Sequence, residues 1–326
     1  MPTLAFLGGA HIHTPGFIGN LKDREGFSTK WFYDHDLARA EARAATLEGA
    51  QATDDLNAVL SDPEVEAVVI CSETDRHEEL VKATVAAGKH LFVEKPLGFG
   101  AKDAREMANE IEKAGLTYQT GYFSRGIPAL MKIKELVDAG AFGKITRVRG
   151  SNCHSGALGR WFDTDWRWMA DPKIAGCGAF GDLGTHSLDI LLWIFGDVKS
   201  VTGQIDVGTN AYDGCDETGE AILRFESGAI GTLAAAWDDV ANPVSYLVSG
   251  TEGHAAVIGG KLHLKTKDFD GIVEDLPEAA SSGFGAFLDA LEGKSVSLVT
   301  ASEAARRSEV MAAIYEGATQ GTWVTP

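Results

Sequence analysis

The sequence predicts an α/β protein in two parts: a doubly wound parallel sheet, then a second α/β domain with a mostly antiparallel or mixed sheet. Short apolar runs alternate with helical patterns through the first third of the chain, as in a parallel sheet with crossover helices. After Gly121, strand-like runs follow one another without intervening helices, which indicates antiparallel or mixed pairing. We therefore expect two domains, residues 1–121 and 122–326.

The expected elements of the first domain are short and bounded by turn residues. The continuous apolar run Val65–Cys71 is typical of a strand covered on both faces. Gly88 and Gly115 each follow a helical pattern, and glycine commonly ends a helix. In chain order, the expected strands are Thr3–Leu7, Lys30–Asp34, Val65–Cys71, His90–Val93 and Thr117–Thr120, and the expected helices are Leu37–Leu47, Glu78–Ala87 and Ala101–Ala114.

The second domain shows a different order of expected helices and strands. The pattern over Asp182–Phe195 is an amphipathic helix, whereas Cys153–Phe180 is rich in glycine and aromatic residues and shows little periodicity. The other expected helices are Ile127–Ala139, Phe284–Leu291 and Ser302–Gln320, and the expected strands are Ile145–Asn152, Val198–Val207, Glu220–Phe225, Ile230–Trp237, Tyr246–Ser249 and Leu262–Lys265. No Ser/Pro-rich linker separates the domains, so we expect them to pack closely around a cleft, a favoured ligand site.

Composition excludes several classes of protein. With 326 residues, 44% apolar and 23% charged, the chain matches an ordinary globular protein rather than a disordered chain or a coiled coil. A net charge of −18 repels nucleic acids and anionic membranes. The apolar start reads as a first strand, not a signal peptide, and no run approaches a membrane span. The four scattered cysteines, Cys71, Cys153, Cys177 and Cys215, indicate reduced thiols in the cytoplasm.

A glycine turn directly after the first expected strand is the first candidate site. The run LGGAHIH is a degenerate form of the Gly-x-Gly-x-x-Gly dinucleotide fingerprint, with Gly8 at the tight turn. Gly9 and Ala10 are small enough for a pyrophosphate to approach the backbone. A plain glycine turn is the alternative. We expect His11 and His13 to lie near a phosphate and predict no metal site.

The end of the second expected strand supplies a candidate for ribose binding. A carboxylate at Asp34 can accept both ribose hydroxyls of NAD. It lies further from Gly8 than usual, and Asn20–Gly26 looks like a small insertion that accounts for the difference. Asp34 and Asp36 would repel a 2′-phosphate, which favours NAD over NADP. Asp34 could also, or instead, cap the helix that follows.

Glu94-Lys95-Pro96 follows the strand His90–Val93. Ligands collect at the carboxyl ends of strands in a doubly wound sheet, so Lys95 would point into the cleft. Its ammonium could donate a hydrogen bond to a substrate hydroxyl and stabilise alkoxide character. The alternative is an exposed lysine paired with Glu94, and these residues alone favour that alternative.

Asp182 and His186 stand four residues apart in the expected helix, so they share one helical face. A carboxylate beside an imidazole suits proton transfer near neutral pH. The alternative is that Asp182 caps the helix and His186 lies in the core. Asp189 could support His186 or simply be solvated.

The aromatic segment Cys153–Phe180 offers residues for a polyol pocket, because aromatic faces with polar edges suit sugar-like ligands. A loop that packs on the sheet is the alternative. A zinc site is a remote further option. The pocket candidates here are His154, Trp161, Trp166 and Arg167, and the zinc option would use Cys153, His154, Cys177 or His186.

Together these motifs resemble the Gfo/Idh/MocA family of sugar and inositol oxidoreductases. The resemblance covers nearly the whole chain in order, and Glu-Lys-Pro and Asp-x-x-x-His are its most specific pieces. The residues that carry it are Ala67–Ile70 with Thr74 and His77, Lys89–Leu97, Thr120–Tyr122 with Arg125 and Pro128, Gly143–Ile145, Gly181–His186 with Asp189, and Gly250–Gly253.

The resemblance implies an N-terminal Rossmann domain and a C-terminal α/β domain whose large open mixed sheet often forms the interface of dimers or tetramers. The family's lysine, aspartate and histidine match Lys95, Asp182 and His186. The chain departs from the family at His13, in place of a glycine, and at Cys71-Ser72-Glu73, where a Thr-Pro turn is common. We expect cofactor contacts from Gly8, Gly9, Ala10, His11, His13, Asp34, His35, Cys71, Ser72, Thr74, His77, Glu94 and Lys95, and substrate contacts from Lys95, Tyr122, Arg125, His154, Trp161, Trp166, Arg167, Asp182 and His186.

We therefore expect a cytoplasmic NAD-dependent dehydrogenase acting on a sugar, polyol or cyclitol hydroxyl. His186 would accept the hydroxyl proton, Lys95 would hydrogen-bond the developing alkoxide, and Asp182 would orient the imidazole or bind a neighbouring hydroxyl. The lysine and histidine roles could be exchanged. One alternative is an NAD-dependent glycoside hydrolase of the same family, which would release no net NADH. Another is a non-enzymatic dinucleotide-binding regulator, which would not need these three residues.

Overall fold

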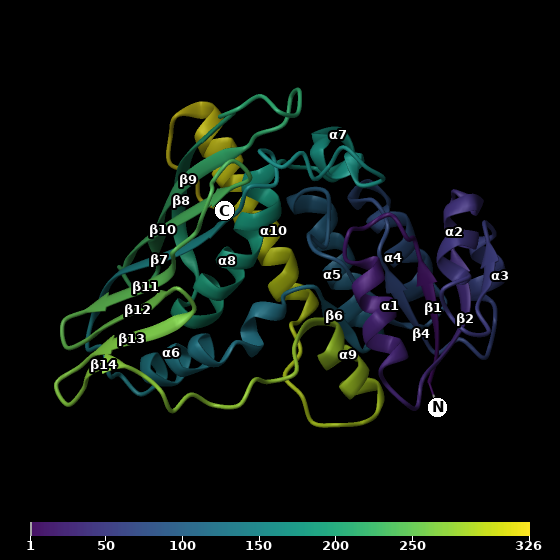
Figure 1. Ribbon diagram of the computed structural model, residues 1–326, viewed down its shortest axis with the longest axis horizontal. Coiled ribbons are helices and arrows are strands. Elements are labelled where there is room, and N and C mark those ends of the chain that lie inside the picture. Colours follow the sequence, from purple (N-terminus) through teal and green to yellow (C-terminus); the bar gives the residue numbers. More distant parts are fainter. Residues whose placement is uncertain (1) are drawn as a thin grey trace.

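The computed structural model describes residues 2–326 and confirms an α/β fold built on two sheets (Figure 1). The first sheet has six strands in the order β3-β2-β1-β4-β5-β6. The second has eight, in the order β14-β13-β12-β11-β7-β10-β9-β8. Among the helices of residues 2–326, none combines the length and apolar character that crossing a bilayer requires.

All neighbours in the first sheet pair in parallel. Its strands are β1 (Thr3–Leu7), β2 (Ser28–Tyr33), β3 (Gln51–Thr53), β4 (Ala67–Ile70), β5 (His90–Val93) and β6 (Tyr118–Thr120). The connecting helices are α1 (Thr14–Lys22), α2 (Leu37–Ala44), α3 (Leu56–Leu60), α4 (His77–Ala86) and α5 (Ala101–Ala114). The strand order reverses between β1 and β4, and this switch point is where doubly wound sheets bind ligands.

The second sheet is mixed, as expected. β7 and β10 pair in parallel, and the other neighbours are antiparallel. Its strands are β7 (Ile145–Cys153), β8 (Val198–Asp206), β9 (Thr218–Phe225), β10 (Ile230–Ala236), β11 (Val244–Gly250), β12 (His254–Ile258), β13 (Lys261–Lys265) and β14 (Asp270–Ile272). The later helices are α6 (Pro128–Asp138), α7 (Pro172–Ala175), α8 (Ala179–Phe195), α9 (Gly283–Leu291) and α10 (Ala301–Gln320).

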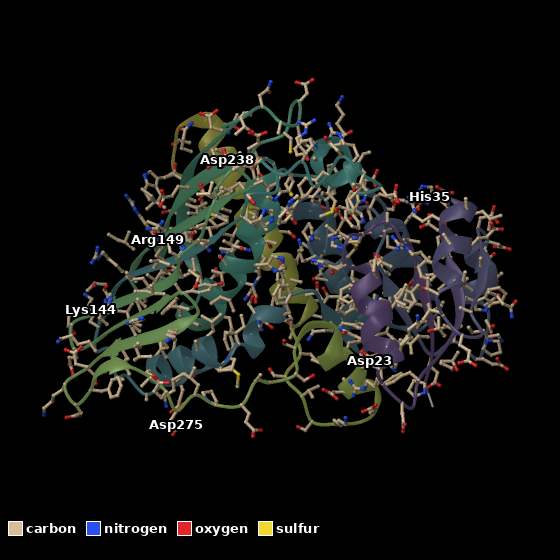
Figure 2. All side chains as sticks on the ribbon, viewed as in Figure 1. Asp23, His35, Lys144, Arg149, Asp238 and Asp275 are labelled. Atoms are coloured by element: carbon tan, nitrogen blue, oxygen red, sulfur yellow. The ribbon has the colours of Figure 1, made fainter. Side chains whose placement is uncertain are left out.

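One face of the second sheet is covered and the other is open. α8 and α10 lie on the side that faces the first domain, and within residues 2–326 no helix covers the outer side (Figure 1). The strands alternate accordingly: in β9, Leu223 and Phe225 are buried, whereas Ile222 and Arg224 are exposed. Arg149 of β7 points outward from the same open face (Figure 2).

The last two helices join the two domains. Phe284 and Phe287 of α9 pack on Phe92 of β5. Ala304 at the start of α10 lies in the core that covers the first sheet, whereas Ile314 near its end lies in the core of the second domain. The chain therefore returns to the first domain after building the second, and the two domains pack closely, as the missing linker predicted.

Candidate active site

The turn between β1 and α1 is buried and packs closely against the neighbouring strands. Gly8 has φ of +90°, a conformation that favours glycine. A Cβ on Gly8 would lie 2.6 Å from the Ser72 Cα, and a Cβ on Gly9 would lie 2.9 Å from the ring of Phe32. Helix α1 then starts at Thr14, and the first N–H groups of a helix attract an anion. The residues present therefore fit the pyrophosphate of a dinucleotide, although the last fingerprint glycine is replaced.

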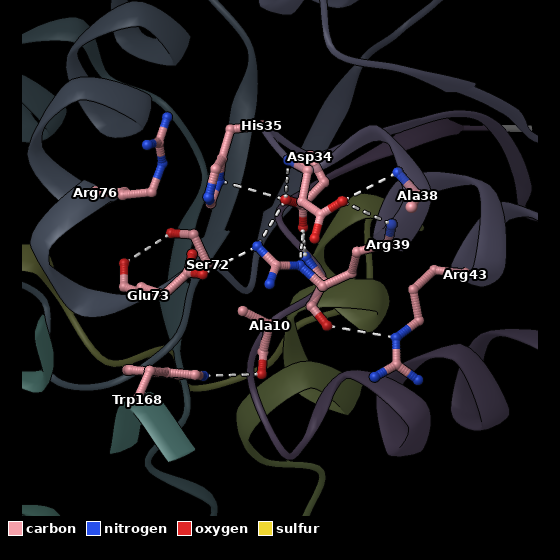
Figure 3. Close-up of polar contacts among 12 residues, drawn as sticks. Ala10, Asp34, His35, Ala38, Arg39, Arg43, Ser72, Glu73, Arg76 and Trp168 are labelled. Carbon is pink, nitrogen blue, oxygen red and sulfur yellow. Dashed lines mark hydrogen bonds and ion pairs between the residues drawn. The ribbon is translucent and has the colours of Figure 1, made fainter. Parts of the chain in front are cut away.

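Asp34 follows β2 and is fully buried. Its Oδ2 accepts the N–H of Gly9 at 2.8 Å and Nε of Arg39 at 2.7 Å. Its Oδ1 accepts the N–H of Asp36 at 2.9 Å and Nη2 of Arg39 at 2.8 Å (Figure 3). Burial raises the pKa of this carboxyl, but the hydrogen bonds from Arg39 and the backbone outweigh burial and hold the pKa below its usual value. The carboxylate is thus ionised and faces the glycine turn.

The N-cap of α2 is Asp36 rather than Asp34, so Asp34 does not cap the helix. Asp36, not Asp34, accepts the N–H groups of Ala38 and Arg39 at the start of α2. Arg39 also donates to Oε1 of Glu73, in the loop after β4, at 2.9 Å. Arg39 was not among the expected residues, although a basic residue in the first turn of a helix that follows Asp34 was a usable signal.

Lys95 connects the two domains. Its Nζ donates to Oδ1 of Asp182 at 2.5 Å, and its side chain is only 3% exposed. Burial lowers the pKa of Lys95, but the charges of Asp182 and Glu94 outweigh burial and raise the pKa, so the ammonium persists. Trp237 Nε1 donates to the other oxygen of Asp182 at 3.3 Å. The alternative of an exposed lysine paired with Glu94 is therefore wrong.

Asp182 and His186 both lie inside helix α8, which begins a turn earlier than expected, at Ala179. Asp182 is therefore not the helix cap. His186 is 6% exposed, and its Nδ1 has no hydrogen-bond partner. Burial, assisted by the charge of Lys95, lowers the pKa of His186 to about 3, so the ring is neutral at physiological pH. Within residues 2–326, Asp182 holds Lys95 and Trp237 and makes no hydrogen bond to His186.

These three side chains line one cavity. It has a volume of about 310 Å³ and lies between the domains. Lys95 comes from the first domain, and Asp182 and His186 come from the second. The lining residues are Ile12, His13, Lys95, Phe123, Asn152, His154, Trp161, Phe162, Met169, Asp182, Leu183 and His186. An ammonium, a carboxylate and a neutral imidazole thus converge on one space, a set suited to binding a hydroxyl and moving its proton.

The structure brings only some of the expected substrate residues to this cavity. His154 and Trp161 line it, with their rings stacked at 4.7 Å. Tyr122 is buried, and its hydroxyl bonds Thr185 Oγ1 at 2.8 Å. Trp166 packs against the core of the second domain, and Arg167 lies over the ring of Tyr212. Phe123, Asn152 and Met169 also line the cavity, and nothing in the sequence marks them for this position.

Arg125 is another expected substrate residue that lies outside the lining. It forms a buried ion pair with Asp189 at 2.6 Å, and Arg307 pairs with the same carboxylate at 2.9 Å. Asp189 is therefore neither solvated nor a support for His186. It pairs with both guanidinium groups, and Glu303 of α10 supplies a second carboxylate to Arg125 at 2.9 Å, so these contacts hold α8 and α10 together.

Of the remaining expected cofactor residues, some contact the glycine turn and others lie away from it. Ser72 lies against the glycine turn, the carbonyl of Cys71 accepts the N–H of His11 at 3.0 Å, and Thr74 is buried. The side chain of His35 is partly exposed near Asp34, and His77 Nδ1 bonds the carbonyl of Pro96 at 3.0 Å. An unforeseen contact comes from the second domain: Trp168 Nε1 donates to the carbonyl of Ala10 at 3.1 Å (Figure 3).

His11, His13 and Glu94 form a compact polar cluster. His13 Nδ1 lies 2.9 Å from Glu94 Oε1, and one ligand atom from each residue lies within 4.8 Å of the others, a spacing that could hold a metal ion. The sequence did not predict this cluster, because Glu94 is remote from both histidines along the chain. The residues of the zinc option do not form such a group within residues 2–326.

A glycine turn at the switch point, a buried carboxylate after β2 and a polar cavity between two domains define a dinucleotide-binding protein with a separate substrate domain. The family models agree. A model described as an oxidoreductase family with an NAD-binding Rossmann fold matches residues 4–122, and the Gfo/Idh/MocA C-terminal domain model matches residues 130–256. The chain belongs to the Gfo/Idh/MocA family.

Known relatives are similar over part of their length. Levoglucosan dehydrogenase of Pseudarthrobacter phenanthrenivorans is 25% identical over 67% of this chain and 61% of its own. Myo-inositol 2-dehydrogenase of Thermotoga maritima is 33% identical over 55% of this chain and 52% of its own. The chain thus spans about half to three fifths of the length of these relatives. GenD2 from gentamicin A biosynthesis, solved in complex with NAD, is 26% identical, with a TM-score of 0.81 over 100% of this chain and 96% of its own.

Proposed function

We propose that this protein is an NAD-dependent dehydrogenase that acts on a secondary hydroxyl of a sugar, polyol or cyclitol, or on the corresponding ketone. The observation that carries the proposal is the convergence of Lys95, Asp182 and His186, from two domains, on one cavity. Relatives named as levoglucosan and myo-inositol dehydrogenases support the substrate class. Bound NAD⁺ would supply the chemistry of the reaction by accepting a hydride from the carbinol carbon.

The three polar side chains of the cavity have different roles in the reaction. The ammonium of Lys95, held by Asp182, donates a hydrogen bond to the substrate oxygen and stabilises the negative charge that develops there. His186 is neutral and accepts the hydroxyl proton. A histidine with so low a pKa is a weak base, so this transfer requires that Lys95 lower the pKa of the hydroxyl. Asp182 acts by positioning Lys95 rather than the imidazole.

The shape of the cavity supports a small ring with several hydroxyls. The stacked rings of His154 and Trp161 offer an apolar face, and Asn152 and Asp182 offer polar groups around it. Specific binding of such a ligand requires a few placed polar groups on a largely apolar wall. We infer a monosaccharide, an anhydrosugar or an inositol rather than a long chain.

The proposal is tested with a panel of sugars, inositols and anhydrosugars, read as absorbance of reduced cofactor. On the best substrate, we expect Lys95→Ala to lower kcat by about 100-fold or more, the usual cost of losing one oxyanion donor. Lys102→Ala removes a lysine that is 90% exposed and serves as the matched control. Turnover above half the wild-type value in Lys95→Ala would contradict the mechanism. Release of free sugar without net NADH would indicate the glycoside hydrolase instead.

We also propose a homo-oligomer formed through the open face of the second sheet and a location in the cytoplasm. Ile222 and Ile230 are exposed on that face and support the first proposal. The four free cysteines, which are common in a reducing compartment, support the second.

A further inference from the structure

Asp34 has no spare hydrogen-bonding capacity. An ionised carboxylate has about four lone-pair sites, and this one already accepts two N–H groups from the backbone and two from Arg39. A ribose diol at this position must therefore displace donors that are already bound. The backbone donors of Gly9 and Asp36 are fixed by the turn and by the start of α2. Arg39 is the donor that can leave.

Glu73 lies on the other side of the Arg39 guanidinium. Its Oε1 accepts Arg39 Nη2 at 2.9 Å (Figure 3). Its Oε2 is buried and has no hydrogen-bond partner. A buried carboxylate oxygen without a partner is costly, and a second N–H from the same guanidinium would satisfy it in the two-pronged geometry that arginine and carboxylate prefer. Because Arg39 already touches Glu73, this change needs only a small movement.

We propose that Arg39 moves from Asp34 to Glu73 when the adenosine ribose binds, and that Glu73 is the positioning residue that makes the chain select NAD over NADP. With Arg39 held by both prongs on Glu73, Asp34 is free to accept the two ribose hydroxyls. This inference rests on the use of NAD in the proposed function. It concerns the ribose end of the cofactor, not the cavity at Lys95.

The charges explain the selection. Asp34, Glu73 and Arg39 together carry one net negative charge, which repels a 2′-phosphate that carries about −1.5 to −2 near neutral pH. Glu73 also competes with such a phosphate for Arg39. Without the Glu73 carboxylate, the pair of Asp34 and Arg39 has no net charge. The 2′-phosphate of NADP is then the group to which Arg39 can move when it releases Asp34. Loss of Glu73 should therefore weaken NADH binding and strengthen NADPH binding.

The test is fluorescence titration of the full chain with NADH and NADPH at one fixed salt concentration. We expect Glu73→Gln to weaken NADH binding by about 10-fold or more, in the range for a lost bond to a charged group, and to tighten NADPH binding. Glu73→Asp keeps the charge and should restore most of the preference for NADH. Glu78→Gln removes an exposed carboxylate of α4 and serves as the matched control.

A double-mutant comparison identifies the part played by Arg39. In Arg39→Ala, Asp34 is already free, so we expect NADH to bind and Glu73→Gln to have no further effect in this background. Equal changes in NADH and NADPH affinity in Glu73→Gln, or an undiminished effect without Arg39, would overturn the inference. Because the readout is binding, it is separate from turnover: a failed substrate panel alongside the expected affinities would sink only the dehydrogenase proposal.

Discussion

Two histidines near Lys95 show how burial fixes protonation at single residues. The His11 ring is 3% exposed, and His186 is almost as deeply buried. Removal from water is the largest cause in both, and it lowers each pKa from 6.5 to about 3. The charge of Lys95 acts in the same direction. Both rings are therefore neutral in the folded protein; Nδ1 of His11 accepts the N–H of His13 at 3.2 Å, whereas Nδ1 of His186 has no partner.

These low pKa values predict how stability changes with pH. Between about pH 6.5 and pH 3, the unfolded chain binds protons at these histidines and the folded chain does not, so their contribution is present above pH 6.5 and is lost as pH falls. Each ring can contribute up to about 1.4 kcal/mol per pH unit. We expect His186→Gln to flatten the slope of unfolding free energy between pH 6.5 and pH 5 by about 1 kcal/mol per unit in urea titrations.

The control for this experiment is His263→Gln on β13, in the outer part of the second sheet. The same urea titrations are made on this variant. If the slopes of unfolding free energy against pH were the same for wild type and His186→Gln, the imidazole would be protonated in the folded state. That result would contradict the assignment of His186 as a neutral proton acceptor.

The β1–α1 turn predicts that a side chain at Gly8 is not tolerated, and Gly26 provides the matched control. Gly8 and Gly26 have nearly equal φ, +90° and +93°. A Cβ on Gly8 would strike the loop after β4, whereas a Cβ on Gly26 would meet nothing within 4 Å. Gly26→Ala should cost about 1–3 kcal/mol from backbone strain alone. Gly8→Ala should cost about 2 kcal/mol more and abolish NADH binding, because the turn must leave Ser72.

Urea unfolding and NADH titration of both variants check this prediction. Equal destabilisation, with NADH binding intact in Gly8→Ala, would show that the turn can move away from β4 without consequence. In that case the close approach would not be what shapes the cofactor site.

The elements themselves were predictable where their patterns were long. β1, β5 and α5 lie where the sequence placed them, because each has a clear period and a glycine or a charged turn at its end. Helix α1 was missed because Pro15, Gly16 and Gly19 imitate a loop, and tertiary packing overrides their low helix propensity. β3 and β14 have three residues each, which is too few to show an alternating pattern.

The sequence indicated which residues would form the candidate site, but not which of them would pair with one another. The spacing of Asp182 and His186 placed them on one helical face, but their meeting with Lys95 was expected only from the family resemblance, because the residues around Lys95 alone favoured an exposed lysine. The partners are tertiary contacts with no sequence signal: Asp182 holds Lys95, and Asp189 holds Arg125 and Arg307. This is why residues near a motif, such as Arg125, were assigned to substrate although a buried carboxylate had a stronger claim.

The open face of the second sheet predicts that several chains assemble. Its outward side chains include Ile222, 42% exposed, and Ile230, 53% exposed, beside Arg149 and Arg224. Exposed apolar residues on the open face of a sheet, beside charged side chains, are typical of an interface, and a stable dimer would cover about 1,200–2,000 Å². We expect light scattering after gel filtration to give the mass of two or four chains.

Two substitutions locate the interface. Ile222→Glu places a charge on the open face and should shift the protein toward a smaller species, because an unpaired buried charge is strongly unfavourable. Leu37→Glu adds the same charge at an exposed apolar residue of α2 in the first domain and should leave the mass unchanged. NADH affinity should be intact in Ile222→Glu, since the glycine turn belongs to the other sheet. A wild-type monomer at micromolar concentration, or equal shifts from both variants, would remove this face as the interface.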